Sequence, residues 1–317
     1  MKNVLLVTGG AGFIGSEFVR QESRDDLWTK IYVVDALTYA SDLSRIQLEI
    51  DSGRIELIHG RVEDESSYKS LIPAVSHIAH FAAETHVDRS IVNGSPFLKS
   101  NIEGTYVLLE LARQRPQIRT LLVSTDEVYG SIPNGEATEE SKMIAASVYS
   151  ASKASADLLA LANHATHLQD VLITRSCNNY GPFQTPEKLI PLAISKLLAG
   201  QKVPIYGSGE NIREWIFVSD HTQGIQKVLA KGKSGEVYNI GTGHRVSNLE
   251  IIEILLEKLG MDESCIEYVP DRKGHDYRYA ISSQKIRSEL DWSPVIEIDK
   301  GLELTVESHL RPKEKNL

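Results

Sequence analysis

Residues 4–15 read VLLVTGGAGFIG, a short apolar run that leads directly into four closely spaced glycines. The apolar run predicts a buried strand, and the glycines at positions 9, 10, 12 and 15 lie where this strand would turn into a helix that begins near Phe13. Glycines at such a turn let backbone N–H groups approach a pyrophosphate, and the helix N-terminus attracts its charge. The stretch therefore predicts the first unit of a dinucleotide-binding fold.

The rest of the first half repeats this alternation of short apolar runs and longer helix-like segments. Strands are predicted at residues 4–8, 31–35, 55–60, 78–81, 120–125 and 170–175. Because fully apolar strands are typical of a sheet covered on both faces, the predicted fold class is α/β, a doubly wound parallel sheet of Rossmann type. After residue 175 the pattern loosens into loops and short helices. We therefore expect a dinucleotide-binding domain over residues 1–175 and a smaller C-terminal α/β lobe over residues 176–317, with some segments returning to the first domain.

Composition narrows the classes of partner. With 41% apolar and 24% charged residues, the 317-residue chain is predicted to be globular. A net charge of −9 without a basic run disfavours nucleic acid and anionic membranes, although helix termini can still bind a small phosphorylated ligand. The two cysteines, Cys177 and Cys265, form neither a disulfide framework nor a CxxC pattern. No apolar run is long enough for a signal peptide or a membrane span, so a soluble, cytoplasmic protein is expected.

Asp35 identifies the expected cofactor. It lies at the end of the second predicted strand, about 20 residues after Gly15. A carboxylate at this point accepts hydrogen bonds from the ribose hydroxyls and repels a 2′-phosphate. The predicted cofactor is therefore NAD rather than NADP.

Two further patterns carry acid–base chemistry. Tyr149 and Lys153 are spaced i and i+4 in YSASK, which places both on one face of a predicted helix. An ammonium group next to a phenol lowers the phenol pKa, so Tyr149 is a candidate base, and Lys153 can also hold a cofactor ribose. An exposed tyrosine with a solvated lysine is the alternative interpretation. Asp126 and Glu127 form the second pattern, two adjacent acids at the end of a predicted strand.

Together with the glycine-rich turn, the Tyr-Lys pair resembles the extended short-chain dehydrogenase/reductase superfamily, whose members act on nucleotide sugars. Over nearly its whole length the chain is similar to the dTDP-glucose 4,6-dehydratases of that superfamily. The stretches that carry this similarity are AAETHVDRSI (82–91), STDEVYG (124–130), YSASKASAD (149–157), NNYGPFQTPEKLIPL (178–192), IYGSGENIREWIFVSDH (205–221) and DRKGHDYRY (271–279).

The resemblance implies a role for each of the catalytic candidates Thr125, Asp126, Glu127, Tyr149 and Lys153. Tyr149, held by Thr125, would take the proton of the sugar 4-hydroxyl while NAD accepts the C4 hydride. Glu127 would remove the C5 proton as a neutral Asp126 protonates the departing 6-hydroxyl, and the hydride would return to C6. Because consecutive residues in a regular strand point to opposite faces, we expect the strand to end at Thr125 and turn, so that both acids face the sugar.

The resemblance also implies two sets of binding residues. The cofactor set comprises Gly9, Gly12, Phe13, Ile14, Gly15, Asp35, Ala36, Leu37, Thr38, Arg61, Val62, Ala82, Ala83, Thr85, Ser100, Tyr149 and Lys153. The substrate set comprises Thr85, Thr125, Asn178, Glu187, Lys188, Leu189, Pro204, Tyr206, Arg213, Asn248, Arg272 and His275. Arg61 is a departure, because the family has an acid there beside the adenine, and an arginine cannot accept the adenine amino proton. His86 and Asp88 have no third ligand at a suitable spacing, so no metal is predicted.

The sequence and the resemblance lead to three alternative hypotheses for the function and one hypothesis for the oligomeric state. The first is dehydration of dTDP-glucose, which would yield a 4-keto-6-deoxy product. The second is dehydration or 4-epimerisation of a UDP- or GDP-linked sugar, kept open because the C-terminal TVESHLRPKEKNL lacks the aromatic residues that the family often has there. The third is a non-catalytic NAD-binding regulator, which would need neither the Tyr-Lys pair nor the two acids. A homodimer is expected to form through the segments 96–115 and 149–164.

Overall fold

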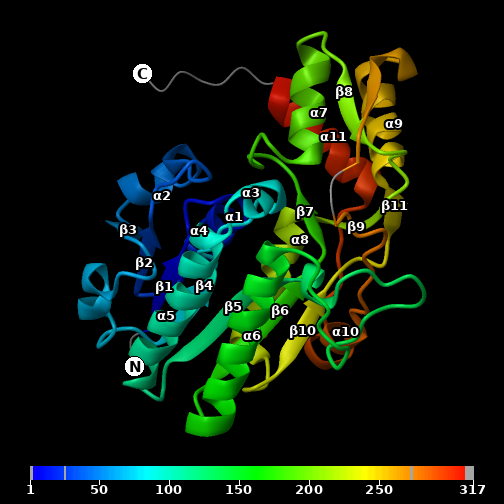
Figure 1. Ribbon diagram of the computed structural model, residues 1–317. Helices are drawn as coiled ribbons and strands as arrows, with labels where there is room; N and C mark the ends of the chain where they lie inside the picture. The colour runs from blue at the N-terminus through cyan, green and yellow to red at the C-terminus, as the bar shows by residue number, and fades with distance from the viewer. Residues whose placement is uncertain (1–2, 25, 272–273, 311–317) are drawn as a thin grey trace.

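The centre of the molecule is a seven-stranded parallel sheet (Figure 1). The computed structural model describes residues 3–24, 26–271 and 274–310. The sheet order is β10-β6-β5-β4-β1-β2-β3. Its strands are β1 (Val4–Thr8), β2 (Lys30–Asp35), β3 (Ile55–His59), β4 (His77–His80), β5 (Arg119–Thr125), β6 (Val171–Ser176) and β10 (Val237–Ile240). The predicted doubly wound parallel sheet is confirmed, and the six predicted strands match within one residue at each end.

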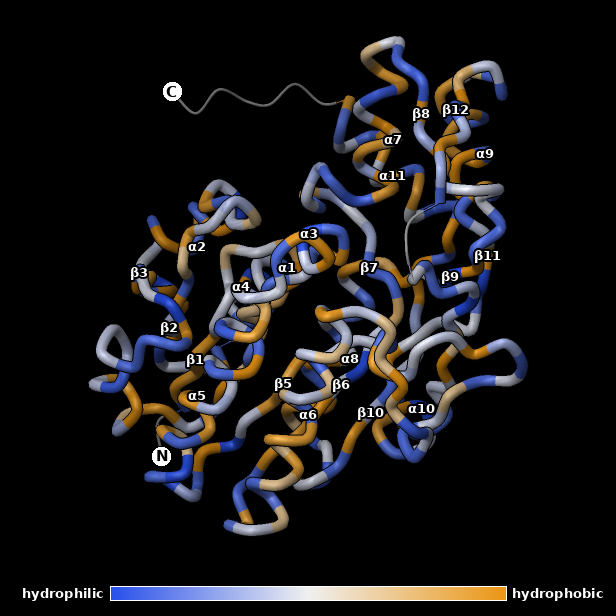
Figure 2. The backbone as a smooth tube through the Cα atoms, in the orientation of Figure 1, coloured by the Kyte–Doolittle hydropathy of each residue, from blue (hydrophilic) through white to orange (hydrophobic). Residues whose placement is uncertain are grey.

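Helices cover both faces of this sheet, which is why its central strands are almost completely buried. On one face α5 (Gly104–Arg113) packs beside α6 (Val148–His167), and on the other α1 (Phe13–Glu22) packs beside α8 (Val218–Lys231) (Figure 1). Every residue of β1 and β6 is buried. The hydropathy colouring of Figure 2 shows hydrophobic segments along the central strands and hydrophilic loop tips outside.

Shorter elements complete this body. They are α2 (Gln47–Asp51), α3 (Val87–Val92), α4 (Ser95–Phe97), a π-helical segment (Leu98–Glu103) that leads into α5, α10 (Gln284–Leu290), and single 3₁₀ turns at Leu43–Arg45, Glu65–Ser67, Lys69–Leu71, Asp126–Tyr129 and Glu263–Cys265. None of the helices in the described ranges combines the length and apolar character that a bilayer crossing requires.

A smaller lobe with its own core lies above the carboxyl ends of the main strands. It contains a three-stranded sheet of β7 (Asn178–Tyr180), β9 (Ile212–Phe217) and β11 (Arg245–Ser247), and a two-stranded sheet of β8 (Val203–Tyr206) and β12 (Ile266–Val269). Helices α7 (Leu189–Leu198), α9 (Asn248–Leu259) and α11 (Ile298–Leu310) pack against them. The chain then crosses back, because α8, β10 and α10 belong to the main body although they follow β7 in the sequence (Figure 1).

The strand order places a crevice between β1 and β4. From β1 the chain proceeds to β2 on one side, and from β4 it proceeds to β5 on the other, so the order reverses at this point. Ligands of such sheets bind at the carboxyl ends of the strands that flank the reversal. Gly9, which follows β1, comes so near the segment after β4 that a Cβ would lie 2.6 Å from the Ala82 nitrogen. It also has a φ of +71°, which a side chain rarely adopts, so glycine is required at this turn.

A buried ion pair fixes α6 to the sheet. Arg175 of β6 donates from Nε to Asp157 Oδ2 at 2.9 Å, and both side chains are almost completely buried. The same guanidinium donates to the Tyr129 hydroxyl at 2.8 Å, which ties down the turn after β5. Removing one partner of such a buried pair is strongly destabilising, because an uncompensated charge remains inside. The pair therefore holds in fixed positions the two elements that carry the candidate catalytic residues.

Candidate active site

A single cleft of about 450 Å³ runs from the crevice between β1 and β4 into the smaller lobe. The glycine-rich turn after β1 lines one end, and residues of β8, β9 and α9 line the other. The strand ends of β5 and β6 and the start of α6 lie between these ends. The cleft therefore connects the two predicted binding sets through the candidate catalytic residues.

The crevice end fits a dinucleotide. Gly12 is the N-cap of helix α1 and has no side chain, so no capping side chain accepts from the first N–H groups of the helix. Gly12 and Phe13 line the cleft, and a helix N-terminus at this place favours a phosphate. Asp35 is buried, and its carboxylate accepts from Ala11 N at 2.9 Å, from Leu37 N at 2.8 Å and from Ser41 Oγ at 2.7 Å. These donors fix the carboxylate at the edge of the cleft, where it can accept from ribose hydroxyls and repel a 2′-phosphate.

Leu37 is the one predicted cofactor residue that does not line the cleft. Its side chain packs against the hydrophobic core, and only its backbone N–H takes part, by orienting Asp35. The assignment of Leu37 to the cofactor set stays a prediction. The remaining cofactor candidates line the cleft, namely Gly9, Gly12, Phe13, Ile14, Gly15, Asp35, Ala36, Thr38, Arg61, Val62, Ala82, Ala83, Thr85, Ser100, Tyr149 and Lys153.

Arg61 lies beside an acidic residue, Glu63, that is not among the predicted cofactor residues. Its exposed guanidinium lies 3.5 Å from Glu63 Oε1, and the Glu63 side chain is only 6% exposed. Both residues line the crevice end of the cleft. A carboxylate is thus present beside the arginine, two positions further along than the family pattern would place it.

The turn after β5 brings the two acids together as predicted. Strand β5 ends at Thr125, and a 3₁₀ turn over Asp126–Tyr129 follows at once. This turn ends the alternation of a strand, so that Thr125, Asp126 and Glu127 all line the cleft. Gly130 closes the turn with a φ of +69°, and a Cβ there would lie 2.2 Å from the Ile144 carbonyl oxygen. Only glycine fits this position.

Asp126 is held in an environment that favours its neutral form. The residue is 3% exposed, Thr125 Oγ1 donates to its Oδ1 at 3.3 Å, and its Oδ2 has no partner within the described part of the chain. Burial, and after it the negative charge of Glu127, raises the pKa of the Asp126 carboxyl well above its ordinary value. Two neighbouring acids in different environments can divide the roles of proton donor and acceptor.

Tyr149 and Lys153 face the cleft from the first turns of α6, and both are buried. The expected lowering of the phenol pKa by Lys153 is not what the structure shows. Burial first, and then Glu127, raises the pKa of Tyr149 far above its ordinary value, although a hydrogen bond with Thr125 opposes the rise. Lys153 instead donates to the Val123 carbonyl oxygen at 2.7 Å. Burial and Glu127 therefore favour the neutral phenol at this position.

The substrate candidates gather at the other end. All of them in the described ranges line the cleft, namely Thr85, Thr125, Asn178, Glu187, Lys188, Leu189, Pro204, Tyr206, Arg213, Asn248 and His275. Arg272 lies outside the described residues. Arg213 is 3% exposed and lies over the Tyr279 ring at 4.3 Å, and its Nη2 donates to the Asp276 carbonyl oxygen at 2.9 Å. A guanidinium that is fixed in this way suits a diphosphate group.

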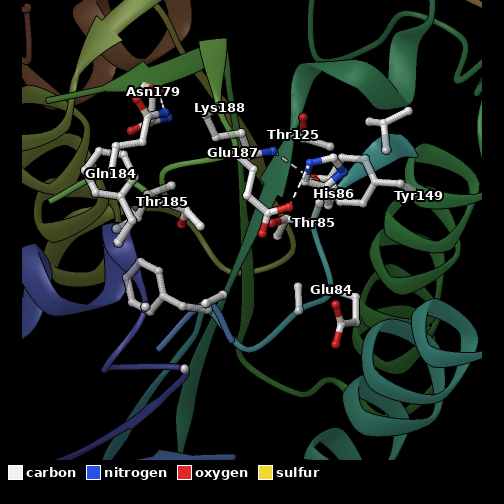
Figure 3. A pocket seen from close by; sticks show the side chains of 18 of the residues that line it. Glu84, Thr85, His86, Thr125, Tyr149, Asn179, Gln184, Thr185, Glu187 and Lys188 are labelled. Atoms are coloured by element: carbon white, nitrogen blue, oxygen red, sulfur yellow. Dashed lines mark hydrogen bonds and ion pairs between the residues drawn. The ribbon is translucent and has the colours of Figure 1, made fainter. Parts of the chain in front are cut away.

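The structure adds contacts that the motifs did not reveal. Glu187 and Lys188, in the loop before α7, reach across the cleft to His86 and Thr85 (Figure 3). These partners are about a hundred residues apart, and no local pattern links them. From the sequence, the only role considered for His86 is that of a metal ligand. In the described part of the chain there is no group of three His, Cys, Asp or Glu side chains that could hold a metal ion.

Replacing Asp126 with asparagine is expected to stabilise the fold increasingly as the pH rises. A carboxyl whose pKa is raised in the folded state costs nothing below its unfolded pKa, and costs progressively more as the pH rises toward the folded pKa. The gain should grow by about 1.4 kcal/mol for each pH unit between the unfolded and the folded pKa of this carboxyl. Urea unfolding of both proteins at about pH 4 and about pH 8 measures it. An equal stability difference at both values would contradict a neutral, buried Asp126.

Comparison with known proteins gives consistent results. The model of the family described as GDP-mannose 4,6 dehydratase matches residues 6–305. A dTDP-glucose 4,6-dehydratase from Streptomyces niveus is 48% identical over 307 residues, which cover 96% of this chain and 91% of the relative. The crystal structure of the dTDP-glucose 4,6-dehydratase DesIV from Streptomyces venezuelae, with NAD and dTDP bound, superposes with a TM-score of 0.94 at 47% identity, and the match covers 97% of each chain.

A second enzyme class shares the fold at lower identity. The UDP-glucose 4-epimerase of Thermotoga maritima is 27% identical, with a TM-score of 0.90 and a match covering 97% of this chain and 98% of the other. The fold alone therefore does not separate dehydration from epimerisation, and the side chains at the centre of the cleft must do so.

Proposed function

We propose that this chain, which belongs to the family described as GDP-mannose 4,6 dehydratase, is an NAD-dependent lyase. It would convert dTDP-glucose to dTDP-4-keto-6-deoxyglucose. The observation that carries this proposal is the cluster of Asp126, Glu127 and Tyr149 at the centre of the cleft. An epimerase needs the tyrosine but has no elimination to catalyse, so the two acids favour the dehydratase. A regulator that only binds NAD would need none of the three.

The proposed reaction assigns one proton transfer to each of these residues. Tyr149, oriented by Thr125, takes the proton of the sugar 4-hydroxyl. The resulting 4-ketone acidifies the C5 proton, which Glu127 removes. Asp126, which burial keeps neutral, gives its proton to the departing 6-hydroxyl. NAD, when bound, would accept the C4 hydride and later return it to C6, and its positive ring charge would favour the phenolate of Tyr149. Glu127 would return the proton to C5 as the hydride arrives. Lys153 would release the Val123 carbonyl oxygen and bind the cofactor ribose.

The two ends of the cleft receive the nucleotides. We assign the crevice end, with Asp35 and the glycine-rich turn, to NAD. In the smaller lobe, Lys188, Leu189, Pro204 and Tyr206 would border the thymine. The diphosphate would bind Arg213, Asn248 and His275, with Arg272 as a further candidate outside the described residues. On this assignment residues 1–175 hold the cofactor, and residues 176–317 mainly hold the nucleotide sugar.

A substrate panel tests the proposal. Purified protein with NAD is incubated with dTDP-glucose, UDP-glucose, GDP-mannose and UDP-galactose, and the products are analysed by mass spectrometry. A product of dTDP-glucose that is lighter by one water is expected. An isomer of unchanged mass would favour an epimerase, and water loss only from GDP-mannose or UDP-glucose would move the assignment to another nucleotide. If no nucleotide sugar reacts, the proposal fails.

We further propose a homodimer in the cytoplasm. Large apolar side chains are exposed on the face formed by α3 to α6, namely Val92, Leu98, Tyr106 and Leu158. Helices α5 and α6 lie side by side there (Figure 1), which suits a helical interface between two copies. Both cysteines are free thiols, as expected in a reducing compartment.

Placing a charge in this face tests the interface. Leu158→Glu is expected to convert the dimer to a monomer, since an unpaired carboxylate would be buried between the copies. Sedimentation velocity measures the mass, and Leu168→Glu, at an exposed position just beyond α6, is the matched control. A dimer that survives in both variants would place the contact elsewhere.

A further inference from the structure

Glu187 joins the two sides of the cleft through an ordered set of contacts. It belongs to the loop before α7 in the smaller lobe, whereas its partners His86 and Arg89 belong to the start of α3 beside the main sheet. His86 Nε2 lies 3.1 Å from Glu187 Oε2. Arg89 binds the same carboxylate through two nitrogens, with Nη2 at 3.0 Å from Oε1 and Nε at 3.3 Å from Oε2. Three nitrogen atoms from the N-cap and the first turn of α3 thus contact this carboxylate and fix its plane.

Arg89, which binds Glu187, also stacks on the ring of Tyr39. Its guanidinium carbon lies 3.7 Å from the centre of the Tyr39 ring, and the Tyr39 hydroxyl donates to Glu84 Oε2 at 3.2 Å. Tyr39 follows Asp35 in the loop after β2, and this loop lines the cofactor end of the cleft. The stacking of Arg89 on Tyr39 therefore connects α3 to the cofactor end of the cleft. A stacked guanidinium has lost most of its freedom, and this makes its paired contact with a carboxylate more specific.

The geometry leaves Glu187 able to accept from a ligand. An ionised carboxylate has about four acceptor positions. Oε1 accepts only from Arg89 Nη2 within the described ranges, whereas Oε2 accepts from both His86 and Arg89. Figure 3 shows Glu187 and Lys188 extending from their loop toward Thr85 and His86 within the cleft. The neighbouring Lys188 Nζ donates to the Thr85 carbonyl oxygen at 3.2 Å, which fixes the loop at a second point.

We propose that His86 and Arg89 are positioning residues that hold the Glu187 carboxylate in place to accept a hydrogen bond from a hydroxyl of the substrate sugar. This inference rests on the proposed function, because it needs a nucleotide-linked sugar in the cleft. Arg89 does not itself touch the sugar, and its effect passes through Glu187. The side chain of Arg89 is 49% exposed, so the bridge adds little to the stability of the fold, and its contribution lies in orientation.

A double-mutant cycle tests this path. Arg89→Met, Glu187→Gln and the double variant are titrated by calorimetry with dTDP-glucose and with dTDP, and KM and kcat are measured for each. Each single variant is expected to bind dTDP-glucose about tenfold more weakly, with dTDP binding unchanged because dTDP lacks the glucosyl hydroxyls that Glu187 would bind. The double variant is expected to be no weaker than Glu187→Gln alone, because the two residues act on the same contact. KM should rise more than kcat falls.

The controls separate positioning from general damage. Arg113→Met removes a similarly paired contact, with Glu110 on the surface of α5, and should leave both affinities unchanged. His86→Gln should reproduce part of the Arg89→Met effect, and it provides a second variant if Arg89→Met folds poorly. Arg89→Lys, which keeps the charge but loses the paired geometry, should fall between wild type and Arg89→Met.

Three results would overturn the proposal. Losses that add in the double variant would mean that Arg89 acts independently of Glu187. Equal losses for dTDP and dTDP-glucose would mean that the bridge only closes the cleft. Wild-type protein that binds dTDP-glucose no more tightly than dTDP would leave Glu187 without a sugar contact. If wild type binds dTDP-glucose but forms no product, the proposed function fails, while the binding cycle still decides the role of Arg89.

Discussion

Tyr149→Phe is expected to slow the first oxidation of dTDP-glucose by about 10²–10⁴-fold, the range that a positioned acid–base group contributes. Phenylalanine fills the same buried space at the start of α6 but has no hydroxyl to take the proton of the sugar 4-hydroxyl. Burial and Glu127 raise the pKa of the Tyr149 phenol, so its role as a base would require a positive charge close by, such as that of the nicotinamide ring. Rapid mixing of the NAD-loaded protein with dTDP-glucose, followed by the absorbance of the reduced cofactor, measures the step.

The matched control is Tyr268→Phe, at an exposed position on β12 away from the cleft. It should reduce the cofactor at the wild-type rate. A Tyr149→Phe protein that also reduces the cofactor at the wild-type rate would show that another group takes the proton, and the assignment of Tyr149 would be withdrawn. Binding of dTDP-glucose should be nearly unchanged in both variants, so a lost rate can be attributed to chemistry.

Glu127→Gln should stop the reaction one step later. The amide keeps the size of the side chain but cannot accept the C5 proton, so oxidation at C4 should continue while product formation falls by about 10²–10⁴-fold. Reduced cofactor should then accumulate, together with the keto sugar. In heavy water, the product of the wild-type enzyme is expected to carry deuterium at C5, because a base removes the C5 proton and it exchanges with the solvent. The sugar recovered from the Glu127→Gln variant should carry almost no deuterium at C5.

Asp126→Asn separates the two acids in the same experiment. This variant loses the proton donor for the 6-hydroxyl but keeps Glu127, so deuterium should still enter C5 of the keto sugar while water loss stops. Exchange that is lost in Asp126→Asn and retained in Glu127→Gln would reverse the two roles. Normal product from Glu127→Gln would place the C5 base on a different residue.

Six of the seven strands of the main sheet could be predicted, because each of the six is short, rich in apolar or β-branched residues and followed by a helical segment or a loop. Strand β10 (Val237–Ile240), which follows the smaller lobe's first strands in the sequence, was not predicted. Val4–Thr8 is buried along its whole length, and its apolar run indicates a strand without information from distant partners. The smaller lobe could not be resolved in the same way. Strands β7 and β11 have three residues each, too few for a periodic pattern, and they pair only through β9 from another part of the chain.

In the candidate site, too, residues that are neighbours in the sequence could be predicted, whereas contacts between distant residues could not. Thr125, Asp126 and Glu127 are consecutive, so a strand followed by a turn was enough to place them together. The bridge from Glu187 to Arg89 joins positions 98 residues apart and could be found only in three dimensions. The sign of the Tyr149 pKa shift was also missed, because the loss of water around a buried phenol outweighs the lysine one turn away, which is bound to a carbonyl oxygen.

The return of the chain from the smaller lobe to the main sheet limits how this protein and its relatives can exchange parts. A crossover between two genes near position 176 would replace the sugar-binding region, but with it would come β10, α8 and α10, which pack against β6 and its neighbours in the cofactor half. A hybrid protein therefore has to preserve the packing of β10, α8 and α10 against the main sheet as well as the ligand contacts. Changes of nucleotide preference on this scaffold are accordingly expected to arise by substitutions in the loops around α7 and β8 rather than by recombination of whole halves.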